Sequence, residues 1–167
     1  MKEKTKKCVF AGTFDPPTLG HKATVEDCLR LFDEVVVALL VNPQKQPCFT
    51  MEQRIEMWKL MFPNDSRIRI VTFDGTVTEL LKREGTPFYA RGIRNGVDLD
   101  FENANYYASK KLDKDFVAVY LPCRQELLHV SSSMVRNSLR FDTPIDEYVT
   151  EEVKNYIEKI KRETKEN

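Results

Sequence analysis

The sequence predicts one α/β domain, in which a five-stranded parallel sheet carries helices on both faces. Three observations support this prediction. The chain has 167 residues, an ordinary size for one domain with a buried core. Short β-branched runs alternate with stretches of helical character. Pro and Gly fall near element ends, with no linker or low-complexity tract between them. Such alternation is typical of a Rossmann-like sheet with right-handed crossovers.

The predicted strands are short apolar runs flanked by polar or turn residues. In chain order they are Cys8 to Ala11, Val35 to Val41, Ile68 to Val71, Phe88 to Ala90 and Phe116 to Leu121. The longest run, Val35 to Val41, is far shorter than the roughly 20 residues that a membrane-spanning helix needs. We therefore expect a soluble protein with no membrane partner.

The predicted helices lie between and after these strands. They are His21 to Leu31, Met51 to Met61, Val77 to Glu84, Leu99 to Leu112, Met134 to Phe141 and Glu151 to Lys161. Thr50, followed three residues later by Gln53, has the pattern of a capping box at the start of the second helix. We expect residues 1–167 to form a single domain, with a C-terminal helix at 151–161 and a frayed tail at 163–167.

Composition excludes several classes of function. The chain has 26 Lys and Arg against 26 Asp and Glu, so no global positive field would recruit nucleic acid. Four cysteines without a CxxC pair, and a charged N-terminus with no apolar segment behind it, predict a reduced cytoplasmic setting. With two histidines and no ligand cluster around either, we expect no metal site built from protein side chains.

The connection between the first strand and the first helix, Gly12 to Gly20, has the features of a phosphate loop. Its glycines allow the backbone to approach a ligand closely, and Thr13 offers a hydroxyl and an N–H. His21 in the first helical turn can donate a ring N–H to a phosphate oxygen. The spacing fits neither GxGxxG nor the Walker pattern. The alternative interpretation is that the glycines only shape a turn and His21 caps a helix.

Basic residues and serines follow the other strands. Lys45 comes after the second strand, and Arg91 and Arg94 come directly after the fourth, so we expect all three at the edge of the sheet that binds phosphate. Arginine can hold a phosphate in bidentate fashion, whereas lysine acts as a mobile point charge. The run Ser131 to Ser133 opens a helix whose free N–H groups suit an anion, or it is an ordinary N-cap.

These segments resemble a known family. Thr18-Leu19-Gly20-His21 resembles the signature of the H/TxGH nucleotidyltransferase superfamily, and the longer string GTFDPxTxGH resembles its phosphopantetheine adenylyltransferase branch. The segment Arg91 to Arg94, the DxxxE pattern at 98–102 and the serine run also match, and the resemblance spans Phe10 to Arg140. It implies transfer of the adenylyl group of ATP to 4′-phosphopantetheine, giving dephospho-coenzyme A. It further implies Mg²⁺ as cofactor and a homo-oligomer, a hexamer.

The resemblance also implies residue roles. Glu102 would meet the sugar or base edge of the nucleotide, while Asp98 suits a helix N-cap or an arginine partner. The catalytic group comprises Thr13, His21, Lys45 and Arg91. The acceptor contacts comprise Thr13, Lys45, Val77 and Arg91. The ATP contacts comprise Thr13, Phe14, His21, Gly92, Ile93, Arg94, Glu102, Leu127, Leu128, His129, Val130, Ser131, Ser132 and Ser133.

The chemistry needs no general base, because an ionised acceptor phosphate is already a nucleophile. The protein must align the two substrates and aim donors at the charge that develops on the α-phosphoryl group. We expect His21 to supply one such donor, so that replacing it with alanine lowers kcat by about 10²–10³.

The sequence departs from the family pattern at Gly75 to Val77, at Leu127, and at Ser109, where the family has an asparagine that helps to hold the pantetheine arm. Two alternatives remain open. One is an enzyme of the same superfamily that uses nicotinamide mononucleotide or glycerol phosphate as acceptor. The other is a protein that binds nucleotide without turnover.

Overall fold

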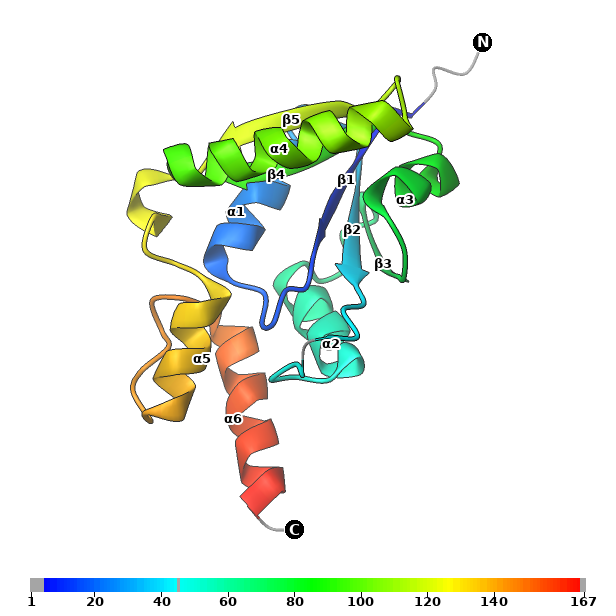
Figure 1. Cartoon of the computed structure of the whole chain (residues 1–167). Helices are drawn as coiled ribbons and strands as arrows, with labels where there is room; N and C mark the ends of the chain where they lie inside the picture. Colours follow the sequence, from blue (N-terminus) through cyan, green and yellow to red (C-terminus); the bar gives the residue numbers. More distant parts are fainter. Residues whose placement is uncertain (1–4, 45, 166–167) are drawn as a thin grey trace.

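The chain folds around a five-stranded parallel sheet with strand order β3-β2-β1-β4-β5, which confirms the predicted fold class (Figure 1). The structure, a computed structural model, describes residues 5–44 and 46–165. The strands are β1 (Lys7–Gly12), β2 (Glu34–Leu40), β3 (Ile68–Phe73), β4 (Phe88–Ile93) and β5 (Val117–Pro122).

Helices connect the strands and complete the chain. They are α1 (Leu19–Cys28), α2 (Met51–Met61), α3 (Val77–Glu84), α4 (Gly96–Leu112), α5 (Ser132–Arg140) and α6 (Glu151–Lys165), with a short 3₁₀ helix at Gln125–Leu127. Both α2 and α3 begin at threonine capping boxes, at Thr50 and Thr76, and both match their predicted ranges. No described helix is long and apolar enough to cross a membrane.

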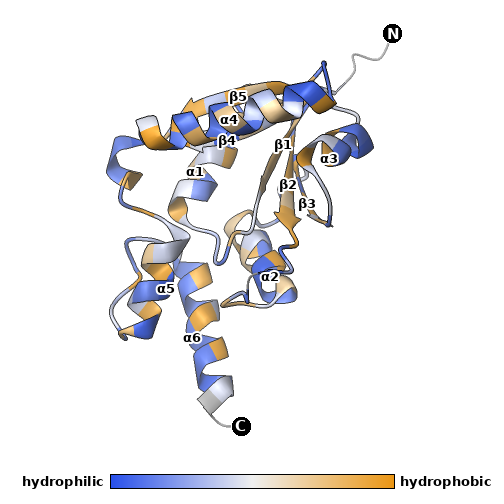
Figure 2. Ribbon diagram, in the orientation of Figure 1, coloured by the Kyte–Doolittle hydropathy of each residue, from blue (hydrophilic) through white to orange (hydrophobic). Residues whose placement is uncertain are grey.

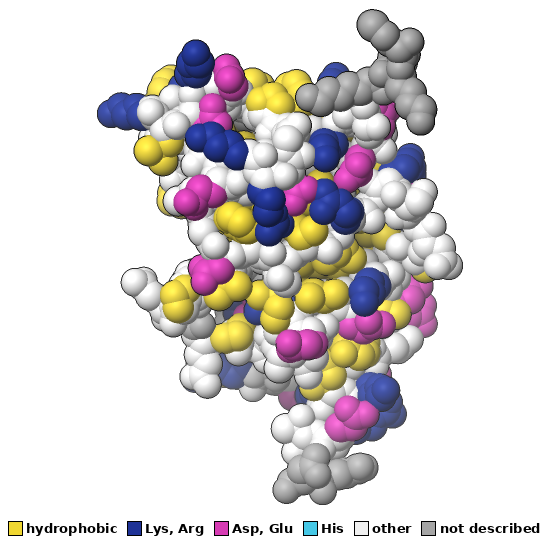
Figure 3. Space-filling view, turned by 90° about the vertical axis from the view of Figure 1, so that its right-hand side faces the viewer, with side chains coloured by type: hydrophobic (Ala, Val, Ile, Leu, Met, Phe, Trp, Pro, Cys, Tyr) yellow, Lys and Arg dark blue, Asp and Glu magenta, His cyan; other side chains and the backbone are white. Residues whose placement is uncertain are grey.

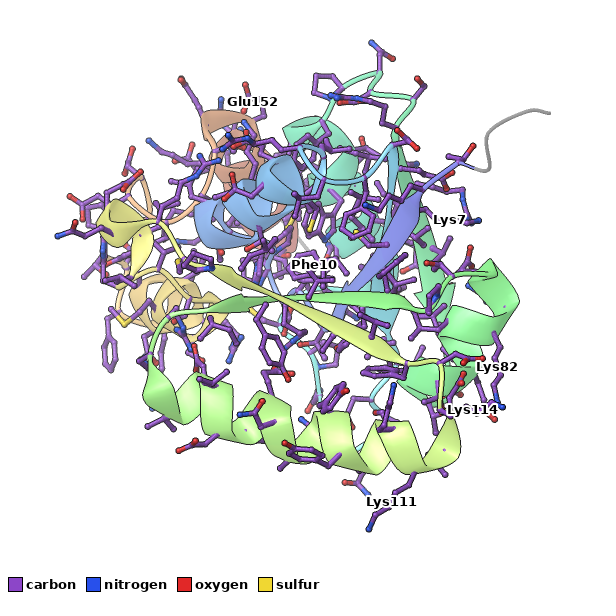
Figure 4. The ribbon with its side chains drawn as sticks, turned by 90° about the horizontal axis from the view of Figure 1, so that it is seen from above. Lys7, Phe10, Lys82, Lys111, Lys114 and Glu152 are labelled. Carbon is purple, nitrogen blue, oxygen red and sulfur yellow. The ribbon has the colours of Figure 1, made fainter. Side chains whose placement is uncertain are left out.

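Alternate residues of β1 and β2 face two separate cores, because successive side chains of a strand point to opposite faces. On one face Phe10 packs with Trp58 of α2 and Val153 of α6. On the other face Val9 packs with Leu80 of α3 and with Phe116. After Glu34, β2 is apolar to its end because both of its faces are covered (Figure 2). Figure 4 shows α1, α2 and α6 on one side of the sheet and α4 on the other.

Several boundaries differ from prediction. The first helix was predicted at His21 to Leu31, but α1 begins two residues earlier and ends at Cys28. The predicted ends of β1, β2, β3, β5 and α5 are each shifted by one or two residues.

β4 continues through Arg91 to Ile93, so Arg91 lies within the strand rather than after it. α4 starts three residues early, because Asn95 rather than Asp98 provides the N-cap. α6 runs to Lys165, four residues beyond the predicted end; of the expected frayed tail, residues 163–165 are therefore helical and 166–167 lie outside the described part of the chain.

The sheet order places the loop after β1 at the centre of one edge. β1 pairs with β2 on one side and with β4 on the other. The connections on the two sides run in opposite directions from this strand, and parallel α/β sheets bind ligands in the crevice at such a switch point. Both signs of charge are interspersed over the face in Figure 3, in line with the balanced composition.

Candidate active site

The loop after β1 is held in place by groups from distant parts of the chain. The carboxylate of Asp15 accepts hydrogen bonds from the backbone N–H groups of Cys48 and Phe49, at 2.8 and 2.9 Å. The guanidinium of Arg54, on α2, donates to the carbonyl oxygen of Thr13 at 2.7 Å. Both Asp15 and Arg54 are buried. The loop is therefore fixed before any ligand arrives, as an alignment site requires.

α5 holds the other side of the same loop. The hydroxyl of Ser132 donates to the carbonyl oxygen of Pro16 at 2.7 Å, and Arg136 donates to the carbonyl oxygen of Asp15 at 2.8 Å. Ser131 is the N-cap of α5, and its side chain accepts from the backbone N–H of Met134. The first turn of α5 therefore lies against the loop, and this arrangement brings the two predicted anion-binding segments together.

His21 forms part of a capping box at the start of α1. The backbone N–H of Thr18 donates to His21 Nδ1 at 3.0 Å, while the Thr18 hydroxyl accepts from the backbone N–H of His21. A ring nitrogen that accepts a hydrogen bond carries no proton in the neutral imidazole, so the N–H of His21 is on Nε2. The capping interpretation and the phosphate-donor interpretation are therefore compatible, because they use different ring nitrogens.

The ring of His21 is neutral over the physiological range. Burial lowers its pKa to about 3, and the nearby positive charges of Arg91 and Arg94 add to this effect. The ring also makes an edge contact with Phe14, at 4.9 Å between centroids. His21 is therefore suited to donate a hydrogen bond and unsuited to take up a proton.

Two arginines on and after β4 are each paired with a carboxylate of α4. Arg91 donates to Glu102 at 2.8 Å and to the carbonyl oxygen of Ala11 at 2.7 Å. Arg94 donates to Asp98 at 3.0 Å. Asp98 thus takes the second of its two expected roles, that of an arginine partner. Glu102 is buried and bound to Arg91, so in this structure it orients that guanidinium, a contact that the sequence did not predict.

A first cavity of about 510 Å³ lies over the loop after β1 and the first turns of α1 and α4. A β-carbon added at Gly92 would lie 2.8 Å from the hydroxyl oxygen of Thr24, so only glycine lets β4 pass this close to α1. Nine of the predicted ATP contacts line the first cavity: Thr13, Phe14, His21, Gly92, Arg94, Glu102, Val130, Ser131 and Ser132.

A second cavity of about 600 Å³ lies between α3, α4 and the face of β4 and β5. Its lining includes the predicted acceptor contacts Thr13, Val77 and Arg91, and also Ser109. The hydroxyl of Tyr120 on this lining is buried and has no hydrogen-bond partner among the described residues. The two cavities meet, because Gly12, Thr13, Arg91, Phe101 and Glu102 line both.

Six predicted contacts are not found in the lining of either cavity among the described residues. Lys45 falls outside the described residues, so its predicted role stays a prediction. Five predicted ATP contacts are absent from the lining of both cavities: Ile93, Leu127, Leu128, His129 and Ser133. Leu127 ends the 3₁₀ helix, and the side chain of His129 is exposed, 4.0 Å from Glu147.

Sequence reasoning missed the groups that hold the loop. Nothing in the local pattern around Asp15, Arg54 or Arg136 reveals their partners, which are 33, 41 and 121 residues away. A signal for His21 was available, because Thr18 and His21 have the spacing of a capping box.

Known proteins resemble this chain both in sequence and in fold. The cytidylyltransferase-like family matches residues 9–138. A phosphopantetheine adenylyltransferase of Flavobacterium johnsoniae is 36% identical over 135 residues, covering 81% of this chain and 88% of that protein. One of Streptococcus pneumoniae is 36% identical over 158 residues, covering 94% and 96%. A solved putative nicotinate-nucleotide adenylyltransferase from Vibrio parahaemolyticus has a TM-score of 0.68 at 23% identity, covering 92% of each chain, a likeness of fold alone.

Proposed function

The chain belongs to the cytidylyltransferase-like family of nucleotidyltransferases, and from that premise we propose that it transfers the adenylyl group of ATP to 4′-phosphopantetheine. The products are dephospho-coenzyme A and pyrophosphate. The observation that carries this proposal is the meeting of two cavities at Thr13 and Arg91. ATP occupies the first cavity, where the phosphate loop and the first turn of α5 lie. The acceptor occupies the second, and its phosphate lies at the junction.

The reaction is an in-line displacement. A phosphate oxygen of the acceptor forms a bond to the α-phosphorus of ATP, while the bond from that phosphorus to the oxygen bridging to the β-phosphorus breaks. Pyrophosphate leaves with the bond electrons, and no proton needs to be removed from the nucleophile. The Nε2–H of His21 donates to an oxygen of the α-phosphoryl group, where negative charge changes most in the transition state.

The guanidinium of Arg91 holds the acceptor phosphate at the junction of the cavities. Glu102 and the carbonyl oxygen of Ala11 fix its orientation, so little side-chain freedom is lost when the phosphate binds. Ser131 and Ser132, with the free N–H groups of the first turn of α5, suit the β- and γ-phosphates. Lys45 would complete the acceptor phosphate site, as the resemblance implies.

Mg²⁺ enters this proposal with ATP. The two carboxylates that line the first cavity, Asp98 and Glu102, are both paired with arginines. Mg²⁺ commonly keeps several waters and binds substrate phosphates with few protein ligands. We therefore assign it to the phosphate oxygens, where it would neutralise charge on the leaving pyrophosphate, and name no protein ligand.

One assay tests the proposal against both alternatives. The purified protein is incubated with ATP and Mg²⁺ and with one acceptor at a time: 4′-phosphopantetheine, nicotinamide mononucleotide or glycerol phosphate. Pyrophosphate release is then measured. Release that depends on 4′-phosphopantetheine is the expected result. Release only with another acceptor identifies a different transferase, and binding of ATP without release for any acceptor indicates a non-catalytic nucleotide-binding protein.

We also propose that the protein forms a homo-oligomer, which the resemblance implies to be a hexamer. Two large apolar side chains of α4 that line neither cavity, Leu99 and Tyr107, are exposed in the single chain. Apolar side chains that a single chain leaves exposed can be covered when subunits associate. Light scattering of the purified protein tests this expectation, and a monomeric mass would contradict it.

A further inference from the structure

The second cavity has one wall formed by a stripe of residues along α4. Glu102, Asn105, Ser109 and Leu112 all line it, and their spacing of three or four residues places them on one side of the helix. Glu102 marks the phosphate end, because it holds Arg91. At 1.5 Å per residue, Asn105 lies about 4.5 Å further along the helix and Ser109 about 6 Å beyond that.

The wall changes from polar to apolar along this stripe. The far end is apolar, because Leu112 of α4 lines it and Phe116 and Ala118 also belong to the lining. An elongated acceptor bound with its phosphate at Arg91 would therefore pass Asn105 first and end against apolar side chains. The intermediate position must then match whatever polar group the acceptor carries a short distance from its phosphate.

Asn105 has free hydrogen-bonding capacity at this position. Its side chain is exposed, and within residues 5–44 and 46–165 it makes no hydrogen bond. A primary amide offers two N–H donors and a carbonyl acceptor. It can therefore donate to the C=O, or accept from the N–H, of a secondary amide in the acceptor. The hydroxyl of Ser109 lies about one turn further along α4 and is on a shorter side chain.

Resting on the proposed function, we propose that Asn105 is a specificity-determining residue that reads an amide in the arm of the acceptor. In 4′-phosphopantetheine a short carbon chain separates the phosphate ester from the first amide, which fits one helical turn between the Arg91 anchor and Asn105. An acceptor with a phosphate but without this amide is bound less well, because the amide of Asn105 would be covered without a partner. Asn105 touches the part of the acceptor that does not react, so it contributes to binding and leaves the chemical step unchanged.

The test compares Asn105→Ala with Asn103→Ala. Asn103 is on the same helix and lines neither cavity, so the control removes the same side chain from another face of α4. Alanine is the better helix former, so neither change should weaken α4, and a thermal melt checks this. We expect Asn105→Ala to raise the KM for 4′-phosphopantetheine about 10-fold, as loss of one or two neutral hydrogen bonds predicts. The KM for ATP, and kcat, should stay within about twofold, because the lost contact stabilises the bound acceptor and the transition state equally. Asn103→Ala should match the unsubstituted protein.

Each other outcome has a defined meaning. An unchanged acceptor KM in Asn105→Ala overturns the inference, and so does a rise in the KM for ATP of similar size. If Ser109→Ala raises the acceptor KM and Asn105→Ala does not, the amide is read one turn further along and the assignment to Asn105 is wrong. If the unsubstituted protein releases no pyrophosphate with 4′-phosphopantetheine, the proposed function itself fails, which is visible before any variant is compared.

Discussion

Replacement of His21 separates its structural role from its catalytic role. Nδ1 accepts from the backbone N–H of Thr18, and Nε2 carries the proton that we assign to the α-phosphoryl group. His21→Ala removes both, whereas His21→Gln can keep the capping bond. The chain provides a precedent, because the side-chain oxygen of Gln53 accepts from the backbone N–H of Thr50 in the capping box of α2.

The magnitudes follow from the two contacts. Loss of one transition-state donor costs about 10²–10³ in kcat. Loss of a helix cap costs about 1 kcal/mol, which lowers the Tm of a domain of this size by about 2–4 °C. We expect His21→Ala to lose both kcat and Tm, and His21→Gln to regain Tm while kcat stays low. Pyrophosphate release at saturating substrates and a thermal melt measure the two quantities. An unaltered kcat in His21→Ala, or a kcat that returns with Tm in His21→Gln, would refute the catalytic assignment.

Three further predictions concern the groups around this loop. Asp15→Ala should lower the free energy of unfolding by about 2–4 kcal/mol, because two backbone N–H groups lose a charged acceptor; a urea midpoint equal to that of the unsubstituted protein would contradict it. Gly92→Ala should lower the free energy of unfolding by about 1–3 kcal/mol, because the added methyl group overpacks against Thr24, and it should weaken ATP binding. Adding Thr24→Ala to the same chain should restore part of the lost stability. Calorimetry measures both the unfolding and the binding of ATP. In the ligand-free protein the His21 ring signal should not titrate between pH 5 and 8 in NMR spectra, since its pKa is about 3. The free energy of unfolding should decrease as the pH is lowered from 6.5, because in this range only the unfolded chain takes up this proton. A titration midpoint near 6.5 would contradict the lowered pKa of His21.

The elements that sequence located best are those whose boundaries are set by local chemistry. α2 and α3 match their predicted ranges, because threonine capping boxes define where they begin. β4 was predicted too short, because Arg91 and Gly92 are not typical strand residues. Pairing with β5 extends the strand through Ile93 regardless of that preference.

The sequence located the segments that make up the candidate site, and it did not reveal the contacts between them. The motif around His21 and the serine run at 131–133 indicated where phosphate would bind, and the structure brings these segments together through Ser132 and Pro16. The pairing of Glu102 with Arg91 could not be predicted, because it depends on how α4 packs against β4. The position of Asn105 in the lining of the second cavity likewise depends on how α4 packs against the sheet.

The sequence by itself determined the fold class and the family, and it located the loop at which we propose that phosphate binds. Strand and helix periodicity, capping patterns and short motifs are all properties of neighbouring residues. The tertiary structure alone decided what holds the loop, how Arg91 is oriented, and where the second cavity lies. These features depend on contacts between residues far apart in the chain, such as Arg54 with Thr13 and Arg91 with Ala11, and the packing of the sheet and helices brings these residues together.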